Sequence, residues 1–370
     1  MHPTNRGPLR IRSAEDCRWD CVALGEVMLR FDPGEGRVRS ARTFHVWEGG
    51  GEYNVARGLK KAFGLRSTVI TALPRNELGL LALDLIQRGG VGTDHIIWRD
   101  HDGVGANTRM GLNFTERGHG VRPAVGCSDR ANSAASQLTP GEVDWDHLFG
   151  VEGVRWLHTG GIFAALSPDT AQTTLAAVEA ARRHDVVVSY DLNYRASLWR
   201  NHPDPEAARR INRRVVSFCD VLIGDEYACA SCLGIDIQRL GTRDHPGDSG
   251  PFDRLVGQLI DEFPNLGVIG ATLREPTTAS INGWGAALWA DGHRYLSTFG
   301  DIDILDRVGG GDAFVAGLAY AFMSGLGAQA AVDIGAAHGA LAMTTPGDNS
   351  MCDLSDVMNL VLGRGAAVVR

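Results

Sequence analysis

The sequence has no long apolar run and no concentration of positive charge, and each absence argues against a class of function. No stretch approaches the ~20 consecutive apolar residues of a membrane helix, and residues 1–10 lack the apolar core of a signal peptide. Lysine and arginine total 36 against 44 aspartates and glutamates, a formal net charge of −8. This balance disfavours nucleic acid as a partner. We therefore expect a cytoplasmic protein that binds neither membranes nor nucleic acid.

The cysteines, seven in 370 residues, show no pattern of pairing. The seven cysteines are odd in number and scattered along the chain, which fits reduced thiols better than a disulfide framework. Cys229 and Cys232 have the C-x-x-C spacing, but no second cysteine or histidine pair accompanies them at zinc spacing. The cysteines therefore give no reason to expect a structural metal or redox chemistry.

What the sequence does have is a regular alternation of strand and helix patterns. The 370 residues are 44% hydrophobic, which is enough apolar material for a large core. The alternation predicts an α/β domain over residues 21–365, with a central, mostly parallel sheet flanked by helices. Residues 1–20 are expected to form an irregular leader, and residues 241–251 a surface insertion. Residues 21–29 resemble a first strand, in which Glu26 faces the ligand crevice or simply lies at the surface.

Two segments interrupt the alternation. Residues 38–46, 106–114 and 121–127 have strand patterns of the antiparallel type, which predict a small sheet outside the main one. This sheet would be formed by about 36–48 and 103–128, and it is placed as a natural lid. Because exposed strand edges invite pairing between subunits, we expect a homodimer through residues 38–46 and 103–128.

The stretch from Asp306 to Gly317 carries the strongest chemical signal. Three consecutive glycines, Gly309, Gly310 and Gly311, let the backbone approach a ligand and turn successive N–H groups the same way. An apolar, helix-compatible run follows at once. Its N-terminus would add further N–H groups and the positive end of the helix dipole, which together form an anion hole suited to phosphate oxygens.

Asp312 stands at the start of that expected helix, where its carboxylate would repel a phosphate. Its presence there therefore indicates a task other than phosphate binding. Taking the proton of a hydroxyl that then attacks phosphorus is such a task, because phosphoryl transfer needs mainly a base, positioning and charge neutralisation. The alternative is an ordinary helix with an aspartate in its first turn. The local sequence does not separate the two.

Two further polar groups follow expected turns and strand ends. Residues 49–56 are expected to form a glycine turn that begins a helix, where Asn54 can hydrogen-bond sugar hydroxyls. A helix start that binds no ligand would explain the same pattern. The expected strand at residues 186–195 ends in a polar cluster that contains Asp191, Asn193 and Arg195. Several polar side chains at the carboxyl end of one strand indicate a site better than any of them alone.

These motifs occur together in one known family. The glycine turn before Asn54 and the glycine run before Asp312 resemble the two signatures of the PfkB (ribokinase-like) carbohydrate kinases, and the likeness extends from residue 21 to 362. It implies a ribokinase-like fold, ATP and Mg²⁺ as cofactors, Asp312 as the catalytic base and the three glycines as the cradle of the γ-phosphate. The matching positions are Gly49, Gly50, Asn54 and Ala56 in the first signature and Asp306, Gly309, Gly311 and Asp312 in the second.

Other segments narrow the resemblance. Residues 128–134, 190–199 and 272–274 are similar to those of 2-keto-3-deoxygluconate kinases and related sugar kinases, whose acidic substrate suits a guanidinium fork. Asn113 and Ser128 depart from that pattern, because they replace tyrosines. The resemblance implies substrate contacts from Gly50, Asn54, Asn113, Arg130 and Arg195. It implies nucleotide contacts from Asn193, Asp225, Thr272, Arg274, Gly309, Gly311 and His338, and Mg²⁺ contacts through water from Asp225 and Glu226.

The combined prediction is an ATP-dependent kinase that transfers the γ-phosphoryl group to a hydroxyl of a small sugar or sugar acid, with 2-keto-3-deoxygluconate as the first candidate. Two alternatives stay open. One is a kinase of a neutral, fructose-like sugar or of a nucleoside. The other is a catalytically silent regulator that binds sugar or nucleotide.

Overall fold

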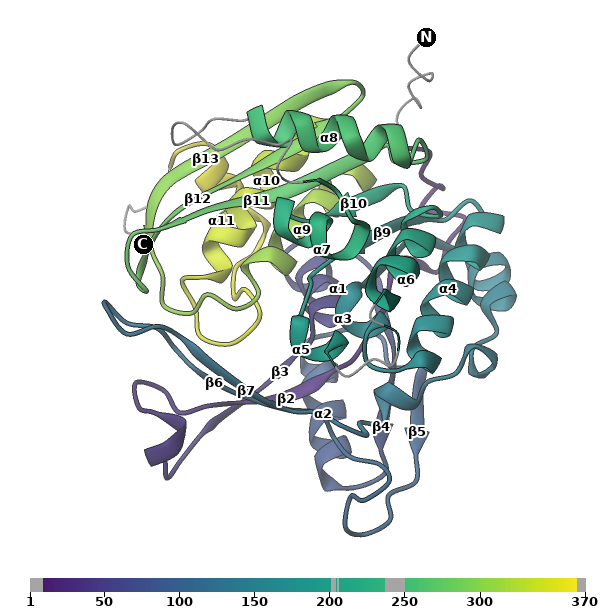
Figure 1. The fold of residues 1–370 in the computed structure, drawn as a ribbon, viewed down its shortest axis with the longest axis vertical. Coiled ribbons are helices and arrows are strands. Elements are labelled where there is room, and N and C mark those ends of the chain that lie inside the picture. Colours follow the sequence, from purple (N-terminus) through teal and green to yellow (C-terminus); the bar gives the residue numbers. More distant parts are fainter. Residues whose placement is uncertain (1–8, 201–203, 205, 237–249, 365–370) are drawn as a thin grey trace.

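A nine-stranded sheet forms the centre of the protein (Figure 1). The structure is a computed structural model that describes residues 9–200, 204, 206–236 and 250–364. The strands of this sheet are β1 (Trp19–Leu24), β4 (Ser67–Pro74), β5 (Ile96–Arg99), β8 (Val154–Gly160), β9 (Val187–Asp191), β10 (Val221–Ile223), β11 (Val268–Pro276), β12 (Ile281–Ala290) and β13 (His293–Asp303). Their spatial order is β13-β12-β11-β10-β9-β8-β1-β4-β5. Neighbours from β11 to β5 pair in parallel, and β12 and β13 add an antiparallel edge, which confirms the expected mostly parallel sheet.

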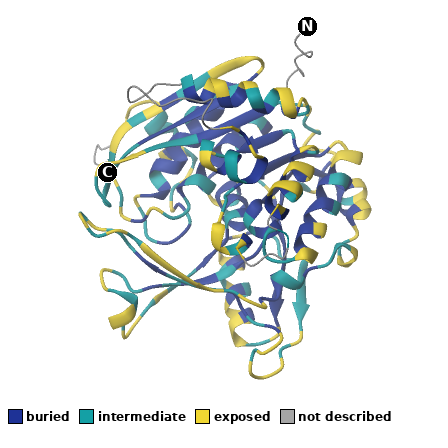
Figure 2. Cartoon of the chain, in the orientation of Figure 1, coloured by how far each residue is buried: buried dark blue, intermediate teal, exposed yellow. Residues whose placement is uncertain are grey.

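Helices cover both faces of this sheet, so that its strands are buried on both sides (Figures 1 and 2). In β1, Val22 and Leu24 pack toward one helical layer, whereas Cys21 and Ala23 pack toward the other. The Cys21 side carries α1 (Gly51–Lys61), α2 (Glu77–Arg88), α9 (Gly310–Met323), α10 (Ala328–Ala342) and α11 (Leu354–Val361); the Val22 side carries α4 (Pro168–Arg183), α6 (Ala207–Val216), α7 (Glu226–Leu233) and α8 (Gly250–Glu262).

Short helices complete the described chain. They are the single turns α3 (Gly161–Ala164) and α5 (Ala196–Trp199), the 3₁₀ helices Val38–Ser40, Ala135–Gln137 and Pro140–Glu142, and the π-helix His147–Gly153. Within the described ranges, no helix combines the length and the apolar character that crossing a bilayer requires.

A second, four-stranded sheet stands apart from the main body (Figure 1). Its strands, in spatial order, are β3 (His45–Gly49), β2 (Met28–Asp32), β6 (Leu112–Glu116) and β7 (Val125–Asp129). The β2–β6 pair is parallel and the other two pairs are antiparallel. Phe31, Phe44 and Phe114 pack against one another on this sheet, with ring centroids 5.0 to 6.0 Å apart. The expected small sheet is confirmed.

Two strand predictions are wrong. Residues 21–29 form two strands in different sheets, because β1 ends at Leu24 and the chain crosses to the small sheet. At the crossing, a Cβ on Gly25 would lie 2.3 Å from a carboxylate oxygen of Glu52, so the position accepts only glycine. Residues 38–46 begin with a 3₁₀ helix, and the strand starts only at His45. The expected insertion lies outside the described residues, apart from Gly250 and Pro251, which begin α8.

Candidate active site

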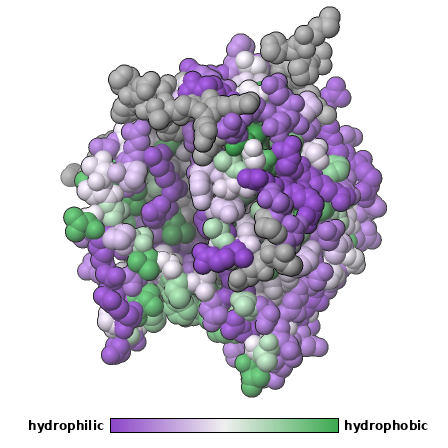
Figure 3. All heavy atoms as spheres, viewed as in Figure 1, coloured by the Kyte–Doolittle hydropathy of each residue, from purple (hydrophilic) through white to green (hydrophobic). Residues whose placement is uncertain are grey.

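A cavity of about 1400 Å³ lies between the main body and the small sheet, and Figure 3 shows this face hollowed there. The cavity lies at the carboxyl ends of β9 and β10, where Asp191 ends one strand and Asp225 follows the other. Asn113 and Ser128 reach it from the small sheet, and Thr272 reaches it from β11. Open α/β sheets bind ligands in crevices outside the carboxyl ends of their parallel strands. The cavity is therefore the candidate site.

The start of α9 forms one wall of the cavity. Gly309 has a φ of +80°, and a Cβ there would lie 1.8 Å from the carbonyl oxygen of Asp348, so only glycine fits. At Gly311 a Cβ would meet no atom within 4 Å, because the backbone faces open space. No side chain caps α9, and the first N–H groups of a helix lack intrahelical partners. This turn therefore offers backbone donors to an anion.

Asp312 lies in the first turn of α9 and accepts a hydrogen bond of 2.7 Å from the Asn54 side chain. Asn54 lies on α1, 258 residues earlier, so the two glycine-rich motifs meet in space. A Cβ on Gly50, which precedes α1, would lie 2.0 Å from the carbonyl oxygen of Glu26. Burial raises the pKa of Asp312 to about 6, and the Asn54 hydrogen bond opposes that rise. Asp312 is therefore mostly ionised at neutral pH and can accept a proton.

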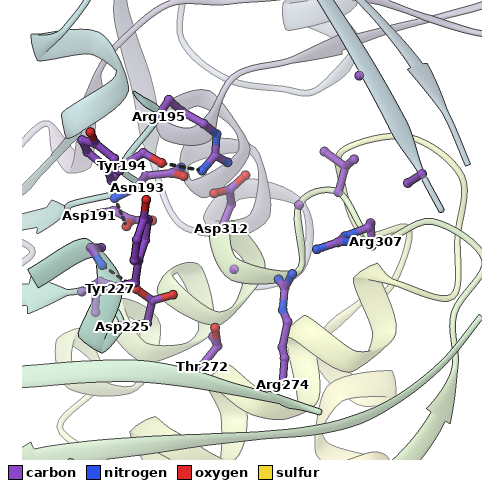
Figure 4. A pocket seen from close by; sticks show the side chains of 18 of the residues that line it. Asp191, Asn193, Tyr194, Arg195, Asp225, Tyr227, Thr272, Arg274, Arg307 and Asp312 are labelled. Carbon is purple, nitrogen blue, oxygen red and sulfur yellow. Dashed lines mark hydrogen bonds between the residues drawn. The ribbon is translucent and has the colours of Figure 1, made fainter. Parts of the chain in front are cut away.

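Three arginines surround the space next to Asp312, and Figure 4 shows their guanidinium groups turned toward it. Arg195 follows β9. Arg274 lies on β11, with its guanidinium carbon 5.3 Å from the centre of the Trp284 ring. Arg307 lies just before α9. Sequence reasoning identified the first two but missed Arg307, although it stands inside the second glycine motif.

Two further carboxyl groups lie near Asp312: Glu52, which is buried, and Asp191, which is partly buried. Burial raises the pKa of Asp191 to about 7, and the charge of Asp312 adds to that rise. Burial raises the pKa of Glu52 to about 8. The ends of β1 and β8 make room for Glu52, because a Cβ on Gly25 or Gly160 would lie 2.3 or 2.8 Å from its carboxylate oxygens. Asp191 belongs to the polar cluster predicted at the end of β9, whereas sequence reasoning missed Glu52.

The small sheet supplies neutral polar groups. Ser128 donates to the side-chain oxygen of Asn113 at 3.3 Å, and Asn113 donates to the Thr115 hydroxyl at 3.1 Å. Neither side chain brings charge to its side of the cavity. The expected site residues that line the cavity are Asn113, Asn193, Arg195, Asp225, Glu226, Thr272, Arg274, Gly309, Gly311 and Asp312.

Five expected residues do not line the cavity, namely Gly50, Asn54, Gly310, Arg130 and His338, and the last two have partners elsewhere in the protein. Arg130 forms an ion pair with Glu26, whose carboxylate is 2% exposed, and does not line the cavity. His338 is fully buried: one ring nitrogen lies 2.7 Å from the carbonyl oxygen of Ala313, and the other lies 2.6 Å from the Ser350 hydroxyl. Both ring nitrogens are thus engaged in the packing of α10, and we withdraw His338 from the nucleotide contacts.

The carboxylates near α7 do not form a closed metal site. Asp225 caps α7 by accepting a hydrogen bond of 2.7 Å from the backbone N–H of Ala228. Nowhere in the described part of the chain do three His, Cys, Asp or Glu side chains gather as metal ligands. A cation at Asp225 and Glu226 would therefore take its remaining ligands from substrates and water.

Comparison with models of known protein families shows to which family the chain belongs. The model of the pfkB family carbohydrate kinases matches residues 19–244 and 283–354, which include both glycine motifs. The chain belongs to this family. The PfkB fold is ribokinase-like, and membership identifies the protein as a carbohydrate kinase.

Three proteins illustrate the likeness. The crystal structure of 2-dehydro-3-deoxygluconokinase from Thermotoga maritima is 32% identical, with a TM-score of 0.83 over 93% of this chain and 98% of that one. A 2-dehydro-3-deoxygalactonokinase from Haloferax volcanii is 27% identical over 95% of this chain and 99% of its own length. A 5-dehydro-2-deoxygluconokinase from Geobacillus thermodenitrificans is 25% identical over 88% of both chains.

Proposed function

We propose that the protein transfers the γ-phosphoryl group of ATP to a hydroxyl of a deoxy keto sugar acid, with 2-dehydro-3-deoxygluconate (2-keto-3-deoxygluconate) as the first candidate and Asp312 as the general base. One observation carries the proposal. Asp312 is held by Asn54 at the uncapped start of α9, on the wall of a cavity that three guanidinium groups enter.

The chain's own groups account for the chemistry. The acceptor hydroxyl loses its proton to Asp312 and forms a bond to the γ-phosphorus, and the bond to the bridging oxygen of ADP breaks. The N–H groups at the start of α9 stabilise the charge on the phosphoryl oxygens. With a pKa of about 6, Asp312 is deprotonated for most of the time at pH 7 and above.

Magnesium fits this site in the manner usual for phosphoryl transfer, with one or two carboxylates and the remaining ligands from phosphates and water. Asp225 and Glu226 line the cavity and would hold it. When bound, the cation would neutralise phosphate charge.

The names of the three relatives support a sugar acid as acceptor, because all three are kinases of deoxy keto sugar acids. Arg195 has an exposed guanidinium that lines the cavity, and we assign it to the substrate carboxylate. Arg130 was expected to share this task, but its ion pair with Glu26 already compensates its charge. That pairing is the one observation that favours a neutral sugar as a second candidate acceptor.

A panel of acceptors tests the proposal. Purified protein, ATP and Mg²⁺ are incubated with 2-dehydro-3-deoxygluconate, 2-dehydro-3-deoxygalactonate, 5-dehydro-2-deoxygluconate, fructose and a nucleoside, and ADP release is measured. We expect kcat/KM for one of the three acids to exceed the value for fructose at least about 100-fold, a difference of ~3 kcal/mol. Fructose or the nucleoside as best acceptor would contradict the acid assignment. Binding of ATP and sugar without ADP release would indicate a silent regulator.

Arginine variants test how an acid is recognised. Arg195→Leu and Arg130→Leu are compared on the best acid and on fructose. We expect both variants to lose more activity on the acid, and Arg195→Leu to lose most, because Arg130 has a partner within the protein. Equal losses on both acceptors would mean that these arginines only maintain the structure.

We further propose that the small sheet acts as the lid and as a homodimer surface. Every residue of β7 is exposed, and β7 is an edge strand of that sheet. Unpaired strand edges favour pairing with a second copy. A monomer in sedimentation at micromolar concentration would contradict the dimer.

A further inference from the structure

Arg307 is a cation beside the positive end of a helix. It lies two residues before Gly309, the N-cap of α9, where the helix dipole disfavours positive charge. Arg274 lines the same space, and burial together with the charge of Arg307 lowers the pKa of Arg274. The two guanidinium groups and the helix end thus repel one another. An anion between them would convert each of these contacts into a favourable one.

The chain on both sides of Arg307 is fixed. Asp306 is 2% exposed and accepts a hydrogen bond of 2.6 Å from the buried Arg30. The backbone N–H of Val308 donates to the Asp306 carboxylate at 3.2 Å. The side chain between these anchors projects into the cavity, with its guanidinium turned toward Arg274 and Asp312 (Figure 4).

Arg307 has no hydrogen-bond or ion-pair partner among the described residues, whereas several exposed arginines do. Arg294, at the start of β13, pairs for example with Asp253 of α8. Arg274 likewise has no carboxylate partner in the described chain, and its buried Nε has no hydrogen-bond acceptor. Although the protein carries a net charge of −8, neither of these two neighbouring arginines has a carboxylate as ion-pair partner in the described chain. This pattern is what an anion-binding site requires.

We propose that Arg307 is a further catalytic residue, whose guanidinium contacts the equatorial oxygens of the transferring phosphoryl group while Arg274 contacts the adjoining phosphate. This inference rests on the proposed function. The bond changes are those of phosphoryl transfer: the acceptor oxygen bonds to the γ-phosphorus, the bridging oxygen leaves on ADP with its electron pair, and the hydroxyl proton goes to Asp312. Arg307 exchanges no proton or bond. It offsets charge that spreads over the phosphoryl oxygens in the transition state.

The test compares Arg307→Met with the wild type on the best acceptor of the panel. We expect kcat to fall about 100-fold, with KM for the sugar within about threefold, because the contact strengthens in the transition state. Arg307→Lys should retain part of the rate, since the charge stays and the fork is lost. Added guanidinium ion should restore part of the activity of Arg307→Ala but none of that of Asp312→Asn. Arg294→Met is the matched control and should keep the wild-type rate.

Three outcomes would overturn the inference. An unchanged kcat with a raised KM for ATP would show that Arg307 only attracts the nucleotide. A fall in kcat that follows a lower melting temperature and resists guanidinium rescue would show a structural role. If no acceptor supports turnover, the proposed function fails separately, and calorimetry still decides: equal ratios of ATP to ADP affinity in the wild type and Arg307→Met would exclude a contact to the terminal phosphate.

Discussion

Two groups of arginines lie next to each other at residues 306 and 307. The Arg30 group consists of Arg30 with Asp306 and Asp348, and the cavity group consists of Arg195, Arg274 and Arg307. The groups differ in whether the arginines have carboxylate partners within the protein. Arg30, on β2, is 1% exposed and donates to two carboxylates, Asp306 at 2.6 Å and Asp348. The residue after Asp306 is Arg307, which enters the cavity with no carboxylate partner among the described residues. The first group is electrostatically complete within the protein, whereas the second becomes complete only with an anion.

This difference separates arginines that maintain the structure from arginines that we propose to act on the substrates. The Arg30 group ties the small sheet to the turn before α9, because Arg30 comes from the small sheet and Asp306 from that turn. Arg307, in contrast, makes no hydrogen bond or ion pair within the described chain that a substitution could break. Substitutions in the first group should therefore lower stability, and substitutions in the second should lower turnover.

The largest effect on stability is expected for Arg30→Met. Removing this guanidinium leaves Asp306 and Asp348 buried without their partner, and breaking a buried pair in this way costs about 3–5 kcal/mol. Chemical denaturation measures the loss. Arg88→Met, which breaks an exposed pair with Asp84 on α2, is the control and should change stability by less than about 0.5 kcal/mol. Equal stabilities of the two variants would remove the distinction between the two groups.

The carboxylates give a second test, through pH. The pKa of Glu52 is about 8 in the folded protein and 4.5 as its ordinary value, so between these pH values only the folded state holds the proton. Stability should therefore fall as pH rises through this window and level off above pH 8. Glu52→Gln lacks this titration, and its stability relative to the wild type should increase by on the order of 4 kcal/mol from pH 4.5 to 8.

Denaturant unfolding of both proteins at several pH values provides the measurement. Asp191 and Asp312 titrate in both proteins, so the difference between the two curves reports mainly on Glu52. A constant difference across the window would mean that Glu52 is ionised in the folded state, and this result would contradict the prediction.

The smallest effect is expected where the small sheet touches the main body. The Gly120 N–H donates to the Ser280 hydroxyl at 2.8 Å, and the Ala279 N–H donates to the Gly120 carbonyl at 2.8 Å, between the β6–β7 connection and the β11–β12 turn (Figure 1). Ser280→Ala removes one of these bonds, worth ~1 kcal/mol. If the contact keeps water from the cavity, ADP release without acceptor should rise up to about fivefold. Ser217→Ala, at the end of α6, is the control. Equal rates of ADP release in the two variants would argue against a closing role of the Ser280 contact.

The sequence predicted those features that short patterns determine. The alternation of apolar runs gave the parallel sheet, and the glycines before Asn54 and Asp312 located two helix starts whose contact the structure confirms at 2.7 Å. Glycine was informative because it was required by geometry: at Gly50 and Gly309 a Cβ would collide with backbone oxygens.

The remaining features depend on partners far away in the chain. Arg130 and Glu26 are 104 residues apart, and nothing local to either residue indicates that they pair. His338 is buried because α9 and α10 pack closely, which its apolar surroundings in the sequence could not distinguish from a pocket wall. The division of residues 21–29 between two sheets follows from the room that Gly25 leaves for Glu52, a contact across 27 residues. Tertiary pairing decided each of these cases.

The most direct measurement is single-turnover phosphoryl transfer by Asp312→Asn at saturating ATP and sugar acid. The asparagine keeps the size of the side chain and removes the base. The account predicts a rate at least about 1000-fold below the wild type, ~4 kcal/mol in activation free energy, with little change in the affinity for either substrate. A rate within tenfold of the wild type would contradict it.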